Sequence, residues 1–359
     1  MKKSVNCSSS GFSALKSINS FFLVGVCSLS LIFSCSRSKQ TDKFHYNAIN
    51  ESTEEILKTH LERVKADSGR VVVMEVKSGT ILSDIFLVHR KNFYVRNINS
   101  GLDQKREPGN LFAPIAMLGI LDSGKLLLSD SVDTQRGLYF SSGIKIFDSN
   151  YEHGGFGKIT YEDALTRSSN IGVVRAMEKA FGDSAYLLKN QLEKMYYGDP
   201  FFNDSELKTP NWKFVPLGYE LKISPKQMIL LYNSIANNGK MVDNRKVLNP
   251  LIASSESINA IQAALISVVK KGTGKLAQSD SVAVAGKTGS VHFWEGSPDS
   301  PISEIYYCAS FCGYFPSDKP KYTCLVMVYN SKDELSYGGR VAAPIFKSIA
   351  EKIMRKEKR

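Results

Sequence analysis

The stretch YYCASFCGYFPSDKPKYTCLVMVY, residues 306–329, decides the fold class of this 359-residue chain. Two runs rich in aromatic and β-branched residues, 306–315 and 322–329, lie on either side of the turn PSDKP. Such runs are typical of β-strands, and the short proline-flanked turn predicts an antiparallel hairpin. Cys312 and Cys324 lie symmetrically about the turn and could face each other, but we expect small buried thiols rather than a disulfide.

Apolar periodicity along the rest of the chain predicts a block of helices with strands before and after it. Further strands are expected over residues 70–76, 81–88 and 282–291. Helices are expected to begin at the capping-box pattern Ser52-Thr-Glu-Glu55 and at Pro108-Gly109, and over residues 171–181, 225–237, 258–269 and 341–354. The order predicts an α+β fold in which one antiparallel sheet is flanked by helices.

The N-terminus is typical of an export signal. A positive start, Met1-Lys2-Lys3, precedes the apolar run FFLVGVCSLSLIF, residues 21–33, which is too short for a comfortable membrane span. Ser34-Cys35 ends the run and resembles a lipoprotein processing site, so we expect Cys35 to be lipidated. An ordinary signal peptide or a short anchor with an incidental cysteine is the alternative.

These features predict the domain organisation and the location. Residues 1–34 form the signal peptide, 35–50 a polar tether and 51–359 a single domain. We expect an exported lipoprotein that is anchored in the membrane and faces the periplasm or the cell exterior.

Composition narrows the class of partner. Hydrophobic content of 43% and charged content of 23% are those of a globular protein. The formal net charge is +11, and removing the three lysines of the first 34 residues, which contain no acid, leaves +8. That excess suits partners with carboxylates or phosphates, and nucleic acid is the weakest of these because no basic run is interleaved with aromatics. The five histidines are scattered, so we expect no metal and no cofactor.

Three short motifs lie along the chain in an order that outlines an acyl-transfer site. They are EPGNLFAP at residues 107–114, Ser168-Ser169-Asn170 between two predicted helices, and Lys287-Thr288-Gly289-Ser290 on a predicted strand. Such a site needs a nucleophile at a helix start, a base one turn later, hydroxyls that relay protons and an oxyanion hole.

In this order the motifs resemble the transpeptidase domain of penicillin-binding proteins, class B of the septal type, over residues 52 to 355. Four further stretches share the resemblance, at residues 70–82, 218–242, 310–330 and 337–354. The resemblance implies the α+β fold that this family shares with serine β-lactamases. From the resemblance we expect no counterpart of the family's large N-terminal non-catalytic domain, and we expect the lipid-type anchor to take the place of its membrane helix.

The resemblance also implies where the chemistry has changed. In the family, Pro-Gly is followed by Ser-x-x-Lys, which supplies the nucleophile and the base. Here the frame residues Pro108 and Gly109 are present, but Asn110 occupies the serine position and Ala113 the lysine position. An amide is not a nucleophile, and a methyl group accepts no proton.

The other two motifs match the family residue by residue. Ser168 is expected to relay protons and Asn170 to hold substrate. Lys287, Thr288, Gly289 and Ser290 are expected to bind substrate. The cation of Lys287 is expected to meet a substrate carboxylate, and Gly289 to let substrate lie against the strand. The backbone N–H groups of Asn110 and Ser290 are expected at the oxyanion-hole positions.

We therefore expect an inactive transpeptidase-like domain in cell-wall synthesis or division. It would act as a scaffold, as a regulator, or as a binder of peptidoglycan stem peptides, and its partner would be that peptide or a cell-wall synthase or division protein. The alternative is an active D,D-transpeptidase or carboxypeptidase with an unusual nucleophile, Ser168 or Ser169. A β-lactam sensor is a third reading. Ser-x-x-Lys also occurs at residues 142–145 and 267–270, neither after Pro-Gly at a helix start.

Overall fold

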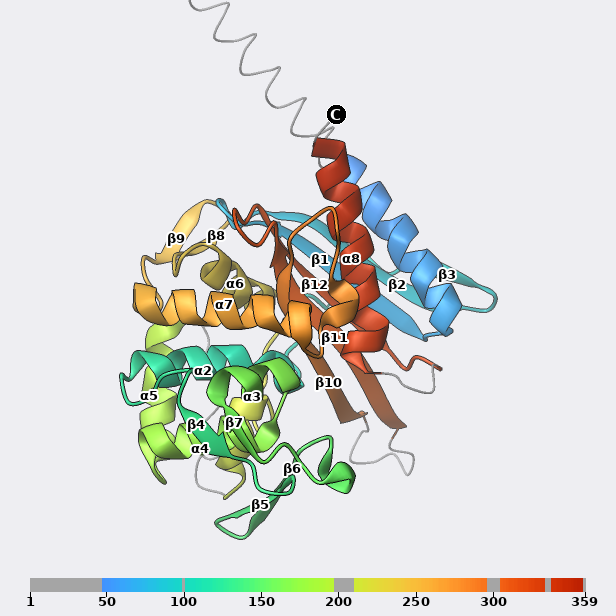
Figure 1. Cartoon of the computed structure of the whole chain (residues 1–359). Coiled ribbons are helices and arrows are strands. Elements are labelled where there is room, and N and C mark those ends of the chain that lie inside the picture. Colours follow the sequence, from blue (N-terminus) through green and yellow to red (C-terminus); the bar gives the residue numbers. More distant parts are fainter. Residues whose placement is uncertain (1–46, 99–100, 197–209, 296–303, 333–336, 358–359) are drawn as a thin grey trace, which may run out of the picture. The chain divides into compact units, whose positions relative to one another are not determined.

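A six-stranded antiparallel sheet is the centre of the fold, with the strand order β10-β11-β12-β1-β2-β3 (Figure 1). The computed structural model describes residues 47–98, 101–196, 210–295, 304–332 and 337–357. The sheet strands are β1 (Ser68–Glu75), β2 (Ile81–Arg90), β3 (Phe93–Arg96), β10 (Ala285–Glu295), β11 (Glu304–Phe315) and β12 (Tyr322–Tyr329). The hairpin that the sequence predicts is therefore β11–β12, and it places strands from both ends of the chain in one sheet.

The helices and short ribbons lie mostly between β3 and β10 in the chain. The described helices are one over residues 47–64, α2 (Ala113–Asp122), α3 (Tyr161–Arg167), α4 (Asn170–Phe181), α5 (Ala185–Met195), α6 (Pro225–Ala236), α7 (Ser255–Lys271) and α8 (Gly338–Glu357). The 3₁₀ turns are η1 (Gly109–Leu111), η2 (Tyr151–His153), η4 (Pro210–Leu217) and η5 (Lys275–Ala277). Three two-stranded ribbons are β4 (Ser131–Asp133) with β7 (Lys158–Thr160), β5 (Leu138–Ser141) with β6 (Ile144–Phe147), and β8 (Met241–Asp243) with β9 (Lys246–Asn249).

One face of the sheet is covered by α8 and the helix over residues 47–64, which lie side by side (Figure 1). Their apolar faces bury alternate residues of the strands, because successive side chains of a strand point to opposite faces. Lys356 donates a hydrogen bond to Ser52 at 2.7 Å and joins the two helices. The expected helix start at Ser52 is wrong, since the helix is already formed at residue 47 and Ser52 is buried within it. The predicted tether over 35–50 thus overlaps the first turn.

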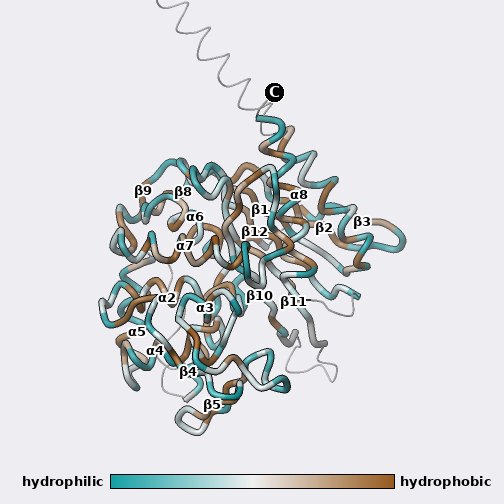
Figure 2. The backbone as a smooth tube through the Cα atoms, in the orientation of Figure 1, coloured by the Kyte–Doolittle hydropathy of each residue, from teal (hydrophilic) through white to brown (hydrophobic). Residues whose placement is uncertain are grey.

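The opposite face is covered by α6 and the block of α2, α3, α4, α5 and α7. Helix α2 is hydrophobic along its length (Figure 2) and nearly all of its residues are buried. A helix that is apolar all round belongs inside a core, because it has no polar face for solvent. Helix α2 is the centre of this block, and the N-terminal end of α2 carries the first candidate motif.

The predicted α+β class and antiparallel sheet are confirmed, with differences in detail. Cys312 lies opposite Leu325, and Gly313 lies opposite Cys324, so the two cysteines are offset by one residue in the hairpin. Both are buried free thiols, and burial raises the pKa of each. The sequence analysis did not predict β3 or the three ribbons, which have three or four residues per strand. It also missed α5, although Leu188, Leu192 and Met195 are buried there at helical spacing.

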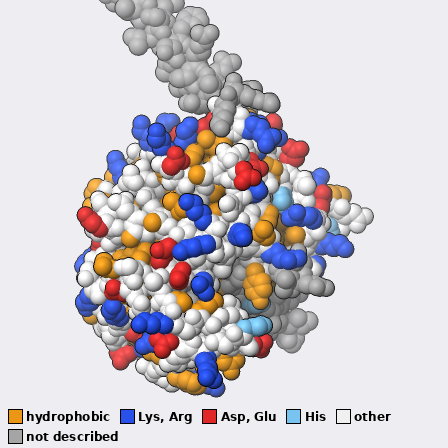
Figure 3. Space-filling view, in the orientation of Figure 1, with side chains coloured by type: hydrophobic (Ala, Val, Ile, Leu, Met, Phe, Trp, Pro, Cys, Tyr) orange, Lys and Arg blue, Asp and Glu red, His pale blue; other side chains and the backbone are white. Residues whose placement is uncertain are grey.

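The predicted signal peptide, Cys35 and most of the tether lie outside the described residues. Among the residues that are described, no helix is both long enough and apolar enough to cross a membrane. On the face drawn in Figure 3, lysine and arginine side chains are interspersed with acidic ones. That face has no continuous basic stripe of the kind that nucleic-acid binding uses.

We predict that Tyr232→Phe destabilises the fold by about 1–3 kcal/mol. The buried hydroxyl of Tyr232, on α6, donates to the backbone carbonyl of Leu111 at 2.8 Å, so the variant leaves a buried acceptor without this donor. Urea unfolding measures the effect. Tyr186→Phe, at an exposed position, is the matched control and should be near neutral; equal effects in the two variants would contradict the role of the Tyr232 hydrogen bond.

Candidate functional site

The first motif forms a tight turn that leads into the buried helix α2. Gly109 adopts a positive φ of 57°, which glycine tolerates without steric cost. A Cβ at Gly109 would also lie 3.1 Å from the Cβ of Val291 on β10, so η1 packs closely against that strand. This geometry places Asn110 at the helix start and buries Ala113 in the first turn of α2.

The second motif is the junction between α3 and α4. Ser168 ends α3 in the left-handed conformation, and Ser169 caps α4 by accepting from the N–H of Gly172 at 3.0 Å. Ser169 also donates to the buried carboxylate of Asp148 at 2.8 Å, which accepts from the N–H of Ile171 at 3.1 Å as well. These hydrogen bonds hold the Ser169 side chain at the helix junction. The Ser168 side chain points toward the third motif instead.

Asp148 is a positioning residue that the sequence reading missed. It lies twenty residues before Ser168, the first residue of the Ser168–Asn170 junction, and has no motif of its own. Burial raises the pKa of its carboxyl, against the hydrogen bonds from Ile171 and Ser169 that lower it. The carbonyl of the preceding residue, Phe147, accepts from Asn170 at 2.8 Å, so this segment fixes both ends of the junction.

The third motif lies on β10, an edge strand of the sheet. The side chain of Lys287 is fully buried, and its amine donates to the Oγ of Ser168 at 2.8 Å and to the carbonyl of Thr288 at 2.9 Å. Burial lowers the pKa of Lys287 to about 7. Within the described part of the chain, no carboxylate forms a salt bridge with this amine.

Asn110 completes a hydrogen-bonded cluster of all three motifs. Its Nδ2 donates to the Oγ of Ser168 and to the Oδ1 of Asn170, both at 3.1 Å. The Oγ of Ser168 therefore accepts two hydrogen bonds, one from the amide of Asn110 and one from the amine of Lys287. The structure brings together Asn110, Ser168, Asn170 and Lys287 as the order of the motifs predicts.

The crevice at this cluster is narrow. Asn110, Ala113, Ser168, Asn170 and Lys287 line a space that has no room for a water molecule. The Oδ1 of Asn110 is buried and accepts no hydrogen bond from the described residues. A buried carbonyl oxygen without a donor lowers the free energy of unfolding by about 1–3 kcal/mol, so Asn110 destabilises the fold at this position.

The geometry differs from the expected roles of the third motif. Lys287 is fully buried, so its amine is not presented to solvent. A Cβ at Gly289 would lie 2.5 Å from the Oγ of Ser310 and 2.7 Å from Leu111, so this glycine permits packing of the core rather than access for substrate. The Oγ of Ser290 accepts from the N–H of Gly338 at 3.0 Å, at the start of α8.

The remaining candidates are also placed. The hydroxyl of Thr288 lies 2.8 Å from that of Thr273, which belongs to the stretch KKGTGK at residues 270–275 upstream of β10.

Neither of the other Ser-x-x-Lys matches joins the cluster. Residues 142–145 belong to the turn and strand of the β5–β6 ribbon. Ser267 donates to Glu162 at 2.7 Å. In the described part of the chain, no group of three His, Cys, Asp or Glu side chains could hold a metal ion.

We predict that the stability of the protein rises with pH above 7 because of Lys287. With its folded pKa lowered to about 7, the folded state binds fewer protons than the unfolded state between that value and the ordinary lysine pKa. The free energy of unfolding should therefore rise by up to about 1.4 kcal/mol per pH unit relative to Lys287→Met, which lacks the titrating group. Urea unfolding of both proteins at pH 7, 8 and 9 measures this. A difference between the two that does not change with pH would contradict the buried neutral amine.

Solved structures with the same fold agree with this architecture. The transpeptidase domain of penicillin-binding protein 3 from Burkholderia pseudomallei aligns with a TM-score of 0.71 and 23% identity over 86% of this chain and 94% of that one. Penicillin-binding protein 3 from Mycobacterium tuberculosis, solved with aztreonam, aligns with a TM-score of 0.71 and 20% identity over 87% of this chain and 78% of that one.

Curated relatives are similar over most of this chain. Stage V sporulation protein D of Bacillus subtilis is 25% identical over 84% of this chain and 52% of its own length. The peptidoglycan D,D-transpeptidase FtsI of Buchnera aphidicola is 26% identical over 91% of this chain and 58% of its own length. The chain thus spans between half and three fifths of these two relatives. The sequence profile described as the penicillin binding protein transpeptidase domain matches residues 29–351, and the chain belongs to that family.

Proposed function

We propose that this chain is a catalytically inactive transpeptidase domain that acts as a scaffold or regulator in peptidoglycan synthesis or division. The observation that carries the proposal is the state of Asn110. Its carboxamide stands at the nucleophile position and is tied to Ser168 and Asn170. Ala113 stands one turn later, where the family has its lysine.

The chemistry of acyl transfer supports inactivity. A covalent intermediate needs an oxygen or sulfur nucleophile with a base in reach, and neither a carboxamide nor a methyl group can supply one. Loss of the nucleophile from a serine enzyme lowers kcat by a factor on the order of 10⁶. Ser168, Asn170 and Lys287 are present and joined with Asn110 by hydrogen bonds, which supports a loss at the reacting pair.

The narrow crevice favours a protein partner over a stem peptide. A peptide that added to β10 would have to enter beside Asn110 and Lys287, where the space has no room for a water molecule. Binding a cell-wall synthase or a division protein needs only the outer surface. The relatives named as peptidoglycan D,D-transpeptidases support this process as the context.

The N-terminal sequence supports an exported, lipid-anchored form. The positive start and apolar run lead to Ser34-Cys35, which suits processing and lipidation at Cys35. Lipidation there would tether the domain to a membrane surface through the residues that precede the helix at 47, and would place it where peptidoglycan is made.

One contact favours a second candidate, an active enzyme that uses Ser168. The Oγ of Ser168 lies 2.8 Å from the amine of Lys287, which is within the range of a nucleophile and its base. A pKa of about 7 leaves a large share of that amine neutral at physiological pH, as a base requires. The same hydroxyl accepts a hydrogen bond from Asn110, whose side chain lines the narrow space beside it, so we rank this candidate second.

We predict that the purified full chain acquires no covalent label from a fluorescent penicillin. The double variant Asn110→Ser, Ala113→Lys should acquire a label that survives denaturation, because it restores a hydroxyl and an amine at the helix start and replaces the carboxamide that lines the narrow crevice by a smaller side chain. Each single variant should stay unlabelled, since the two groups act as one unit. Gel fluorescence after denaturation is the measurement.

Two results would contradict the proposal, either that the wild type is inactive or that its catalytic loss lies at Asn110 and Ala113. Labelling of the wild type that Ser168→Ala abolishes and Ser169→Ala preserves would establish the second candidate. A folded double variant that stays unlabelled would mean that Asn110 and Ala113 are not the only catalytic losses.

We predict that Cys35 carries the lipid. Metabolic labelling with a radioactive fatty acid in a bacterial host should mark the wild type, and Cys35→Ser should lose the mark and accumulate in unprocessed form. Cys27→Ser, within the apolar run, is the matched control and should keep it. A mark that persists in Cys35→Ser would show that the processing site has been assigned wrongly.

A further inference from the structure

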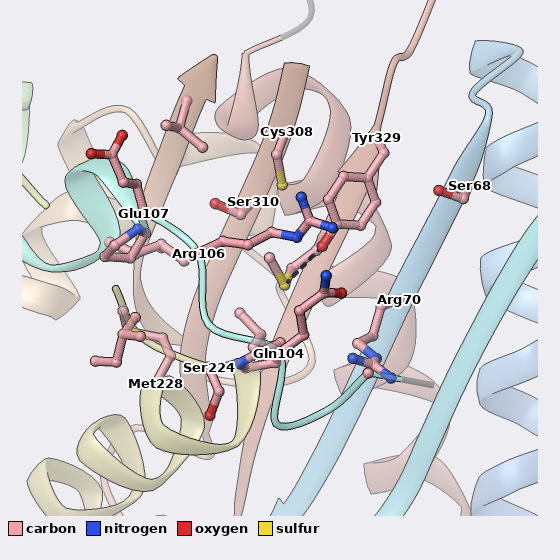
Figure 4. Close-up of a pocket in the computed structure, with 18 of the residues that line it drawn as sticks. Ser68, Arg70, Gln104, Arg106, Glu107, Ser224, Met228, Cys308, Ser310 and Tyr329 are labelled. Carbon is pink, nitrogen blue, oxygen red and sulfur yellow. Dashed lines mark hydrogen bonds between the residues drawn. The ribbon is translucent and has the colours of Figure 1, made fainter. Parts of the chain in front are cut away.

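A second cavity lies between the central sheet and the segment 101–108 (Figure 4). Its volume is about 210 Å³. Strands β1, β11 and β12 line one side of it, and the segment 101–108 and the start of α6 line the other. None of the four residues of the hydrogen-bonded cluster, Asn110, Ser168, Asn170 and Lys287, lines this cavity, so it is separate from the crevice at the three motifs.

The walls of the cavity are largely apolar. Six buried apolar side chains line it from both sides, namely Leu111, Ile223, Met228, Val291, Cys308 and Leu325. Such walls offer no replacement for the hydration of a polar group, whereas an apolar molecule gains free energy when it leaves water for them. The cavity therefore favours a ligand whose body is apolar.

Two methionines give the walls freedom to adjust to a ligand. Met228 lies near the start of α6, and Met327 lies on β12. The thioether of Met327 accepts from the hydroxyl of Tyr329 at 3.7 Å, which is the hydrogen bond drawn in Figure 4. Unbranched thioether side chains fill irregular gaps and make favourable contacts with aromatic rings. These walls therefore suit an aromatic ligand.

The two arginines of the lining are already engaged within the protein. Arg70 pairs with Asp84 at 3.0 Å, and its guanidinium lies over the ring of Phe86. Arg106 extends across the cavity toward Cys308 in Figure 4, and it also has an interaction partner within the chain. An anionic ligand would have to compete with these partners to pair with either arginine.

The two carboxylates of the lining are engaged as well. Asp67 accepts from Asn330 at 2.9 Å and lies 3.9 Å from Lys332. Glu107 accepts from the N–H of Glu220 at 3.0 Å. A charged ligand of either sign would therefore lose its hydration in the cavity without a new partner in return, which is unfavourable.

The volume sets the size of the ligand. A dry apolar cavity of about 150 Å³ binds benzene, so about 210 Å³ has room for a benzene ring with a short chain. We propose that this cavity binds a small uncharged aromatic molecule of about ten non-hydrogen atoms, held by apolar contacts with Met228, Leu325 and Met327. Binding here does not depend on acyl transfer and is expected whether or not the domain is an enzyme.

The cavity shares a wall with the candidate site. Pro108 and Leu111 line it on either side of Asn110 in the chain, and Val291 lines it next to Ser290. The turn η1 thus presents Asn110 to one side and Leu111 to the other. A ligand in the cavity would contact the same turn that holds the nucleophile position.

The chemistry of the ligand is tested by titrating the purified full chain with 4-phenylbutan-1-ol by isothermal titration calorimetry. The matched charged ligand is 4-phenylbutanoate, which has the same ring and the same chain length. At pH 7 the alcohol should bind at least tenfold more tightly than the acid, because the carboxylate loses its hydration without a new partner. Equal affinities, or tighter binding of the acid, would overturn the proposal.

The location is tested by filling the cavity. Met327→Trp should abolish binding of the alcohol, while the volume-conserving Met327→Leu should keep it. Thermal unfolding of each variant shows whether it is folded. If Met327→Trp does not fold, Met228→Trp fills the cavity from the opposite side, and if neither folds, the comparison of alcohol and acid decides alone. Binding of the alcohol that persists in a folded, filled variant, or no binding to the wild type at millimolar alcohol, would also overturn the proposal.

Discussion

The hydrogen bond from Lys287 to Ser168 is the contact on which the arrangement of the site depends. It joins the edge strand of the sheet to the junction between α3 and α4, two parts separated by 119 residues. Because the amine is fully buried and pairs with no described carboxylate, burial favours its neutral form. The sheet and the helical block are therefore linked at this point by a polar pair in a low-dielectric interior, where an unpaired group would be costly.

Asn110 joins this pair through its side-chain amide. Its amide group donates to Ser168 and Asn170 and so keeps the second motif in place. Ala113 is buried and lines the same narrow space as Lys287. Among the described residues, the cluster leaves one buried carbonyl oxygen, Oδ1 of Asn110, without a hydrogen-bond donor.

The same turn, η1, joins three parts of the molecule. Asn110 faces the hydrogen-bonded cluster. The side chain of Leu111 packs on Gly289 and lines the cavity between the sheet and the segment 101–108. The carbonyl of Leu111 accepts a hydrogen bond from the hydroxyl of Tyr232. Its close approach to β10 requires Gly109, where a Cβ would press on Val291. The geometry of the nucleophile position is therefore set by core packing on the side away from the crevice, and packed cores transmit small displacements.

The sequence by itself determined the α+β class, the strands of the central hairpin and the order of the three motifs, because apolar periodicity and turn residues are local signals. It also established that residues 110 and 113 carry no nucleophile and no amine. Only the tertiary structure decided that Lys287 is buried against Ser168, that Gly289 makes room for Leu111, and that Asp148 holds the α3–α4 junction. Those facts depend on contacts between residues far apart in the chain, and no local pattern encodes burial or the distance between two side chains.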